Sequence, residues 1–507
     1  MLKNNIKLIH FAGIISVMNF LFFHLPFFKF VINNIEYQTF SGILVIISLM
    51  ILMLVLNFFM FFLILFLSKI VGKFLLVIFF IINAIAVYFV NTYSVIIDES
   101  MIGNILNTNY EESSSFFSLK LIVYSILFGV LPSIFIVKAK IIKPTLKQFF
   151  TTISFSLLFI AALIFVNASN VLWIDKNSKT LGGLAMPWCY TVNISLFYIH
   201  KNKENEKEIL LPNAIIKDTE KSVIVLVIGE SSRKQNFSLY GYNKDTNPLL
   251  SQVTNLQQYN ANSVATYTNA GVKGILEHTN SDDLYEILPN YLYRNNVEVF
   301  WKTSNWGEPP IHIKNYLNRE ALLPNCKGEG CNYDELLLTN LKDEILKSTK
   351  NKILIVLHTS TSHGPTYSKK YPPNFEKFKP VCNSVELGNC SQTELINAYD
   401  NTIVYTDYIL SSVIKDLKEL KDYKTAMIFV SDHGESLGEK NLYMHGLPMS
   451  IAPKEQFEIP FIVWVSDNSK KQYKTIELVS QNHVFHSVLN FLNIQSPVYK
   501  EDMNIFK

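Results

Sequence analysis

The sequence contains few charged residues and has a small net charge, and both facts limit the classes of partner that it can have. Charged residues make up 17% of its 507 residues, and the formal net charge is only +3. So small an excess of positive charge does not indicate a nucleic-acid partner, and the sequence contains no recognisable RNA- or DNA-binding motif. Internal repeats and long low-complexity linkers are also missing. We therefore expect no nucleic-acid partner.

Cysteine is also scarce. Of the five cysteines, Cys189 stands alone, and the other four form two close pairs, Cys326 with Cys331 and Cys382 with Cys390. Both pairs lie in loop-like sequence, and their spacings fit short disulfides in an oxidising compartment. A four-cysteine zinc site is the weaker alternative, because the C-x₂-C spacing typical of such sites is missing.

Apolar residues are concentrated before about residue 170. Lysines gather at the N-terminus and at 69–73 and 138–147, so these segments are predicted to be cytoplasmic and everything after residue 170 to lie outside. The first apolar stretch is too long for a cleaved signal peptide and is followed by others. Five stretches are long enough to span a bilayer: 8–32, 43–67, 70–92, 119–138 and 149–168.

After residue 215 short apolar runs alternate with amphipathic ones, which indicates an α/β fold with a largely parallel sheet. Buried strands are predicted at 222–228, 297–301, 353–357 and 426–430. We expect three parts: a transmembrane domain of five helices over 1–170, an interfacial bridging helix with a linker over 171–215, and an outer α/β/α sandwich domain over 216–507.

Three of the predicted strands are followed at once by polar residues of the kinds that bind metal ions. Ligand sites in open α/β sheets lie at the carboxyl ends of the strands. Carboxylates next to imidazoles are suitable ligands for Zn²⁺ or a similar divalent ion, and Gly434 allows a tight turn beside them. The residues expected to converge are Glu230, His358, His363, Asp432 and His433, with His445 nearby in a loop.

A nucleophile is predicted between residues 263 and 278. Thr266 and Thr268 precede a short helical pattern. A threonine at a helix N-terminus usually only caps the helix. Beside a divalent cation, the same hydroxyl can lose its proton and attack phosphorus or sulfur. The pattern alone leaves both roles open.

The polar outer segment 98–115 is too hydrophilic to span the membrane. Asn104, Thr108 and Glu112 recur every four residues, so a short helix would present all three on one face. A solvated helix on the membrane surface explains this spacing equally well.

Several longer motifs resemble those of the phosphoethanolamine transferases that modify lipid A and other envelope molecules, within the alkaline phosphatase/sulfatase superfamily. The resemblance covers nearly the whole chain, including the layout of five spans and an outer catalytic domain. The motifs are IGESSR (228–233), HTSTSHGPTY (358–367), NAYDNTIVYTD (397–407), SDHGESLGE (431–439), YMHG (443–446) and IAP (451–453).

This resemblance implies roles for the candidate residues. Glu230, Asp432, His433 and a threonine would hold Zn²⁺, with one or two ions per site. The second threonine of the family's T-x-T element is its nucleophile, which makes Thr268 the expected one. The family often brackets this element with a disulfide. Val264 and Gly274 occupy those places, so this anchor is missing and Thr266 stays an alternative.

The remaining expected roles concern substrates. His363 and His445 match the family's phosphate-binding or second-metal histidines, and His358 is expected to contact substrate. Asn104, Thr108 and Glu112 match the residues that hold the ethanolamine lipid. The implied reaction moves phosphoethanolamine from phosphatidylethanolamine to lipid A, core oligosaccharide or protein. The implied enzyme is a monomer in the bacterial inner membrane, with its catalytic domain in the periplasm.

Four other functions fit the sequence less well. A phosphoglycerol transferase shares the layout, but HTSTSHGPTY favours the ethanolamine enzymes. A plain sulfatase would need a C-x-P-x-R or S-x-P-x-R element, which is missing. A membrane-anchored scaffold would not need the complete set of candidate ligands. A transporter pathway would need more charge within the spans.

Overall fold

The computed structural model describes residues 5–507 except 36, 108–113, 115, 168–169, 171–172, 175–176, 205–207, 282 and 386. Contacts divide the chain into two compact units. The N-terminal unit holds the described residues up to 106 together with 117–200. The C-terminal unit holds those of 107–116 together with 201–507. The first unit is helical and apolar, and the second is built on a β-sheet.

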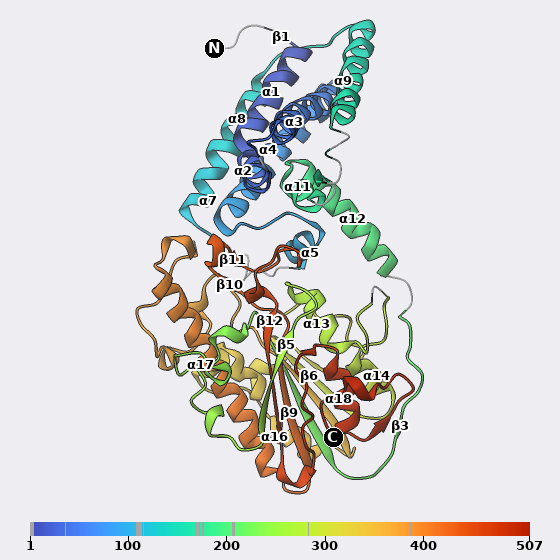
Figure 1. The fold of residues 1–507 in the computed structure, drawn as a ribbon, viewed down its shortest axis with the longest axis vertical. Helices are drawn as coiled ribbons and strands as arrows, with labels where there is room; N and C mark the ends of the chain where they lie inside the picture. The colour runs from blue at the N-terminus through green and yellow to red at the C-terminus, as the bar shows by residue number, and fades with distance from the viewer. Residues whose placement is uncertain are drawn as a thin grey trace. The chain divides into compact units, whose positions relative to one another are not determined.

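Long apolar helices form the N-terminal unit (Figure 1). Helices suit a bilayer because they satisfy all of their backbone hydrogen bonds internally. The segment Leu119–Lys138 consists of α7 (Leu119–Tyr124), a π-helical stretch (Ser125–Val130) and α8 (Leu131–Lys138). Four helices could each cross a membrane: α3 (Phe40–Leu67), α4 (Lys69–Tyr93), Leu119–Lys138 and α9 (Leu146–Val166).

The first expected span, 8–32, is not one helix. α1 (Leu8–Phe23) and α2 (Leu25–Asn34) meet at His24 with a bend of 61°. Pro26 lies in the first turn of α2, where its missing N–H is tolerated, but it would break a helix that continued through it. The described residues therefore contain four helices that could span a membrane, or five candidates if the bent pair is counted as one span.

The stretch predicted as a bridge contains α11 (Ser178–Leu184) and α12 (Trp188–Glu204). The start of α12 is tied to the spans by buried hydrogen bonds. Trp188 donates to the side chain of Asn57 and Tyr190 to that of Asn83, both at 2.9 Å. Because apolar surroundings make unpaired polar groups costly, these bonds fix the beginning of the helix to the bundle.

An eight-stranded sheet forms the centre of the C-terminal unit, in the order β13-β5-β12-β9-β4-β8-β6-β7. Only β12 runs antiparallel to its neighbours. All four predicted strands are present. The strands are β4 (Ser222–Gly229), β5 (Leu256–Asn262), β6 (Glu298–Thr303), β7 (Asn315–Leu317), β8 (Lys352–His358), β9 (Lys424–Ser431), β12 (Glu458–Val465) and β13 (Val479–Ser480).

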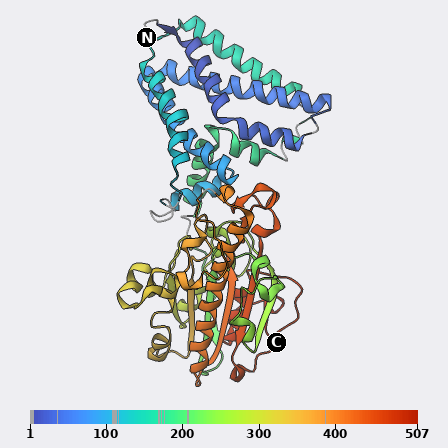
Figure 2. The same cartoon turned by 90° about the vertical axis from the view of Figure 1, so that its left-hand side faces the viewer.

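Helices cover both faces of this sheet (Figure 1). On one face, α13 (Thr268–Leu276), α14 (Leu288–Arg294) and α18 (His483–Phe491) pack against the side chains of β4 in the main hydrophobic core. On the other, α17 (Gln392–Glu419), beside α16 (Leu341–Lys347), runs along the sheet, as the long orange helix in Figure 2 shows. Every residue of β4 is buried, as expected for a central strand covered on both sides.

The two cysteine pairs form disulfides, Cys326–Cys331 and Cys382–Cys390. The prediction of short disulfides is confirmed, and the alternative of a four-cysteine zinc site is wrong because the sulfur atoms are bonded to one another. Cys189 is a buried free thiol.

Candidate active site

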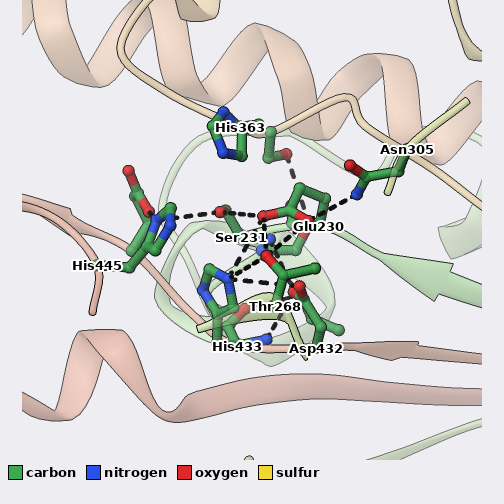
Figure 3. Close-up of polar contacts among 12 residues, drawn as sticks. Glu230, Ser231, Thr268, Asn305, His363, Asp432, His433 and His445 are labelled. Atoms are coloured by element: carbon green, nitrogen blue, oxygen red, sulfur yellow. Dashed lines mark hydrogen bonds and ion pairs between the residues drawn. The ribbon is translucent and has the colours of Figure 1, made fainter. Parts of the chain in front are cut away.

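The candidate site lies at the carboxyl ends of the two central parallel strands. Glu230 follows β4 directly, and Asp432 and His433 follow β9. The Asp432 N–H donates to the Gly229 carbonyl at 2.9 Å, which holds the two strand ends together. Thr268 is the first residue of α13. The structure therefore brings together the four residues expected to bind a metal ion (Figure 3).

The four side chains are close enough to share one ion. The Thr268 hydroxyl oxygen lies 3.4 and 3.5 Å from the Glu230 carboxylate oxygens and 3.3 Å from His433 Nε2. The same Nε2 lies 3.4 Å from Glu230 Oε1 and 3.4 Å from Asp432 Oδ2. All four residues are at most 3% exposed. Buried carboxylates at such distances need a cation between them or nearby.

The hydrogen bonds of these residues orient them so that one nitrogen of His433 and one oxygen of Asp432 remain available as metal ligands. His433 Nδ1 is 2.8 Å from the Gly434 carbonyl, so the other ring nitrogen faces the carboxylates. Asp432 Oδ1 accepts the N–H groups of Ser231 and His433, at 3.0 and 2.7 Å. Asp432 Oδ2 is buried, accepts no hydrogen bond from the described residues and lies 3.4 Å from His433 Nε2. This oxygen, with the imidazole nitrogen and Glu230, fits a divalent metal ion.

Electrostatics agree with a site built for a cation. Burial and the charge of Glu230 raise the pKa of Asp432. Burial alone would lower the pKa of His433, but Asp432 and Glu230 outweigh it and raise that pKa to about 10. Burial alone would raise the pKa of Glu230, but the neighbouring histidines hold it well below its usual value. Proton binding to Asp432 and His433, but not to Glu230, is thus favoured when no metal ion is bound.

His445 belongs to the same cluster. It follows β11 (Tyr443–Met444), which pairs with β10 (Ser436–Leu437). Its Nδ1 lies 2.7 Å from Glu435 Oε2, and its ring centroid lies 4.2 Å from that of His433. Ligand atoms of Glu230, His433 and His445 all lie within 4.8 Å of one another, so His445 is also placed to bind a metal ion.

The second expected histidine, His363, lies beside His445. Their ring centroids are 5.5 Å apart. His363 Nδ1 is 2.7 Å from the Gly364 carbonyl, which orients the ring. Glu435, behind His445, accepts a second hydrogen bond from the Tyr367 hydroxyl. Three imidazoles therefore lie in succession from Thr268: His433 contacts it, His445 follows and His363 is the last (Figure 3).

Thr266 points elsewhere. Its hydroxyl donates to the Leu447 carbonyl at 2.5 Å, and its own carbonyl accepts the Gly446 N–H at 2.8 Å. Thr266 therefore ties the segment before α13 to the loop that carries His445. Val264 and Gly274, which we expect at the family's disulfide positions, face each other: a Cβ added at Gly274 would lie 2.5 Å from Val264 Cγ2. This contact supports the register that makes Thr268 the second threonine of the T-x-T element.

Two glycines allow the close packing of these segments. A Cβ on Gly434 would lie 2.1 Å from the Glu455 carbonyl oxygen, so its role is a close approach of two backbones. A Cβ on Gly271, in α13, would lie 2.2 Å from the Asp432 carbonyl oxygen. The helix that carries Thr268 therefore packs directly against the backbone of the loop after β9 that carries Asp432 and His433, which we call the ligand loop.

His358 lies behind the site. It is fully buried at the end of β8, and its Nδ1 is 3.5 Å from Glu308 Oε2. Burial alone would lower the pKa of His358, but the hydrogen bond and charge of Glu308 outweigh it and raise that pKa. Its Nε2 is 3.4 Å from Asn305 Nδ2. Among the described residues the ring nitrogens of His358 therefore contact Thr303, Asn305 and Glu308, not Thr268.

Asn305 was not predicted. Its amide donates to Glu230 Oε2 at 2.7 Å and to the Thr359 carbonyl at 2.8 Å. Ser231, which donates to the other Glu230 oxygen at 2.8 Å, was also assigned no role. Asn305 follows β6 by two residues, so the rule used for the other three strands would have found it.

Asn104 lies in α5 (Glu99–Asn107) of the N-terminal unit and is half-buried. The other two residues predicted to hold the lipid head group, Thr108 and Glu112, lie outside the described residues.

Comparisons with known proteins agree with this geometry. The sulfatase family model matches residues 222–494, and the model of phosphoethanolamine transferases EptA/EptB matches residues 52–202. The chain is 39% identical to phosphoethanolamine transferase EptA of Helicobacter pylori over 98% of its own length and 96% of that protein.

Solved structures are similar as well. The integral membrane lipooligosaccharide phosphoethanolamine transferase A of Neisseria meningitidis superimposes with a TM-score of 0.87 at 25% identity, covering 98% of this chain and 97% of that one. The C-terminal periplasmic domain of EptC from Campylobacter jejuni gives 0.52 at 34% identity, covering 59% and 97%. The chain therefore belongs to the phosphoethanolamine transferases of the alkaline phosphatase/sulfatase superfamily and is a multi-pass membrane enzyme.

Proposed function

We propose that this enzyme transfers phosphoethanolamine from phosphatidylethanolamine to lipid A or a related envelope acceptor, through a phosphoethanolamine-threonine intermediate on Thr268. The relative from Neisseria is a lipooligosaccharide enzyme, which favours a lipid A or core oligosaccharide acceptor over protein. The lysine pattern and the disulfides favour the inner membrane with the catalytic domain in the periplasm. We expect a monomer.

The assignment of the nucleophile is carried by one observation. The Thr268 hydroxyl oxygen lies 3.3–3.5 Å from Glu230 and His433, whereas the Thr266 hydroxyl is bonded to a carbonyl. Thr268 also begins α13, and the partial positive charge of a helix N-terminus favours an alkoxide there.

Glu230, Thr268, Asp432 and His433 would hold a Zn²⁺ ion. When bound, such an ion lowers the pKa of a coordinated hydroxyl and stabilises negative charge on phosphoryl oxygens. His445 has ligand atoms in the same cluster, so the site has donors for a second ion. Asn305 and Ser231 hold the two oxygens of Glu230 in place.

The first half-reaction uses the chain's own groups as follows. Thr268 loses its proton to water, and its oxygen bonds to the phosphorus of phosphatidylethanolamine. The bond from phosphorus to the glycerol oxygen breaks, and His445 or His363 gives that oxygen a proton, so diacylglycerol leaves. Glu435 hydrogen-bonds His445 Nδ1 and stabilises its protonated form before the transfer.

The second half-reaction reverses these roles. An acceptor oxygen bonds to the phosphorus, the bond to Thr268 breaks, and the threonine oxygen regains a proton from water. If the acceptor is a hydroxyl, its proton returns to the histidine. Asn104, with Thr108 and Glu112, would hold the ammonium and phosphate of the donor lipid.

Intact mass spectrometry of the full-length protein after incubation with phosphatidylethanolamine tests the covalent step. We expect an adduct of phosphoethanolamine mass that maps to Thr268, persists in Thr266→Val and is lost in Thr268→Ala. An adduct on Thr266 would overturn the nucleophile. A glycerol-phosphate adduct from phosphatidylglycerol would show the phosphoglycerol reaction instead, and no adduct with metal bound would contradict the covalent mechanism.

A further inference from the structure

A concave site that shares no lining residue with the candidate active site lies in the C-terminal unit, between α17, the disulfide loop Cys326–Cys331 and residues 372–375. It encloses about 500 Å³, within the range of small-molecule sites. Its lining includes two carboxylates, two aromatic rings and two adjacent prolines: Glu329, Glu335, Phe375, Tyr408, Pro372 and Pro373. None of these residues takes part in the proposed transfer reaction.

The aromatic wall is a cluster separate from the main core. The ring centroid of Phe375 lies 4.8 Å from that of Tyr405 and 4.9 Å from that of Tyr408. The rings of Tyr405 and Tyr408 are nearly parallel, 6.2 Å apart. Because Phe375 and Tyr408 are only half-buried, part of this wall is open to a ligand. Aromatic faces carry partial negative charge and attract cations.

The structure also fixes a carboxylate at the rim. The Tyr408 hydroxyl donates to Glu335 Oε1 at 3.3 Å, and the Glu335 N–H donates to the Tyr405 hydroxyl at 3.0 Å. A Cβ on Gly330 would lie 2.1 Å from Glu335 Oε2, so the disulfide loop approaches this carboxylate as closely as a glycine permits. Glu329, in the same loop, supplies the second negative charge.

This negative pocket has no cation of its own. No lysine or arginine lines it. Within the part of the chain that the structure describes, neither glutamate forms an ion pair, and no lysine or arginine lies over Phe375 or Tyr408. By contrast, Lys244 and Lys377 both lie over the ring of neighbouring Phe378. An aromatic and acidic concavity without an internal partner fits an external organic cation.

We propose that this pocket binds an organic ammonium group, held by Glu335 and Glu329 against the rings of Phe375 and Tyr408. The class of ligand is argued from the pocket alone. That ethanolamine is its source, whether free, as phosphoethanolamine or as a lipid head group, rests on the proposed function.

The test uses the full-length protein in nanodiscs free of ethanolamine lipids. Proton NMR line broadening of choline is compared with that of 3,3-dimethylbutan-1-ol, which has the same shape without the charge. We expect broadening of choline only, weakened about tenfold by Glu335→Gln and by Tyr408→Ala. Tyr408→Phe, which keeps the ring, should bind more tightly than Tyr408→Ala.

Two controls separate this inference from the transfer mechanism. Glu320→Gln makes the same charge change on an exposed residue outside the pocket and should bind choline normally. Thr268→Ala should also bind it normally, and Glu335→Gln should still form the adduct on Thr268. Ethanolamine, phosphoethanolamine and a short-chain phosphatidylethanolamine, each competing with choline, identify the natural source. Equal broadening of both probes, or no effect of Glu335→Gln, would overturn the proposal.

Discussion

At the scale of single residues, the side chains that hold the reacting groups matter as much as the groups themselves. Asn305 and Ser231 each donate to one oxygen of Glu230, and Glu435 holds His445. Such supporting contacts fix the orientation of metal ligands and of catalytic histidines, and their loss commonly weakens metal binding or activity by about 10- to 100-fold.

Replacing Asn305 with aspartate should test this support. The change puts a carboxylate where an amide now donates to Glu230 at 2.7 Å, so two like charges would face each other. We expect transfer to fall by about 10- to 100-fold and the metal content to drop. Elemental analysis and a lipid transfer assay measure both. Asn305→Leu, which removes the bond without adding charge, should have a smaller effect; unchanged metal binding in both variants would contradict the role.

Glu435→Gln should act on proton transfer and not on metal binding. Glutamine can still accept from Tyr367 but cannot stabilise a protonated His445 by charge. We expect kcat to fall by about 100-fold, because the neutral glutamine supplies no negative charge beside the histidine that donates the proton. A loss of bound metal that matches the loss of kcat would mean that Glu435 is only structural.

At the scale of elements, α13 and the ligand loop form one packed unit. Gly271→Ala would force a methyl group against the Asp432 carbonyl oxygen. We expect a loss of about 1–3 kcal/mol of stability in the C-terminal unit, together with reduced transfer, seen as a lower Tm. Gly388→Ala is the matched control, because its new Cβ would meet its nearest neighbour at 3.7 Å. An unchanged Tm for Gly271→Ala would contradict the packing argument.

The elements also show where sequence reasoning succeeds. The strands β4, β8 and β9 are continuous apolar runs that end in polar residues, so both their existence and their shared edge could be predicted. β5 (Leu256–Asn262), with mostly polar side chains, gave no such signal. The bend at His24 was missed because hydropathy counts apolar length and does not register the break before Pro26. Asn305 was missed because β6 ends in the polar residues Lys302 and Thr303. The predicted strand therefore stopped at residue 301, four residues before Asn305.

At the scale of the whole molecule, metal binding should be coupled to folding and to pH. Without metal, His433 has a pKa raised to about 10 by Asp432 and Glu230 despite its burial, and the pKa of Asp432 is also raised. An ion must therefore displace protons, so its affinity should rise with pH. We expect the increase in Tm caused by zinc to grow between about pH 6 and pH 8. Chelation should remove it; a pH-independent gain would contradict this arrangement.

The N-terminal and C-terminal units should also make different contributions to metal binding and to transfer from bilayer lipid. A chain shortened to residues 208–507 keeps the whole sheet and the site residues Glu230, Thr268, Asp432 and His433. It should therefore fold and bind metal, while transfer from bilayer phosphatidylethanolamine should fall steeply, because the donor lipid stays in the membrane. Assays with vesicles and with a water-soluble donor measure the two activities. Full activity of the shortened chain on vesicles would show that the spans are dispensable.

The bonds from Thr266 to Gly446 and Leu447 have a consequence for inhibitor design. They join the segment that carries Thr268 to the loop that carries His445, so neither can shift without the other. A compound that inserts between Thr266 and Leu447 would shift both segments, and with them Thr268 and His445. Substitution of Gly446 or Leu447 would not remove these contacts, because the loop side of each contact is a backbone group.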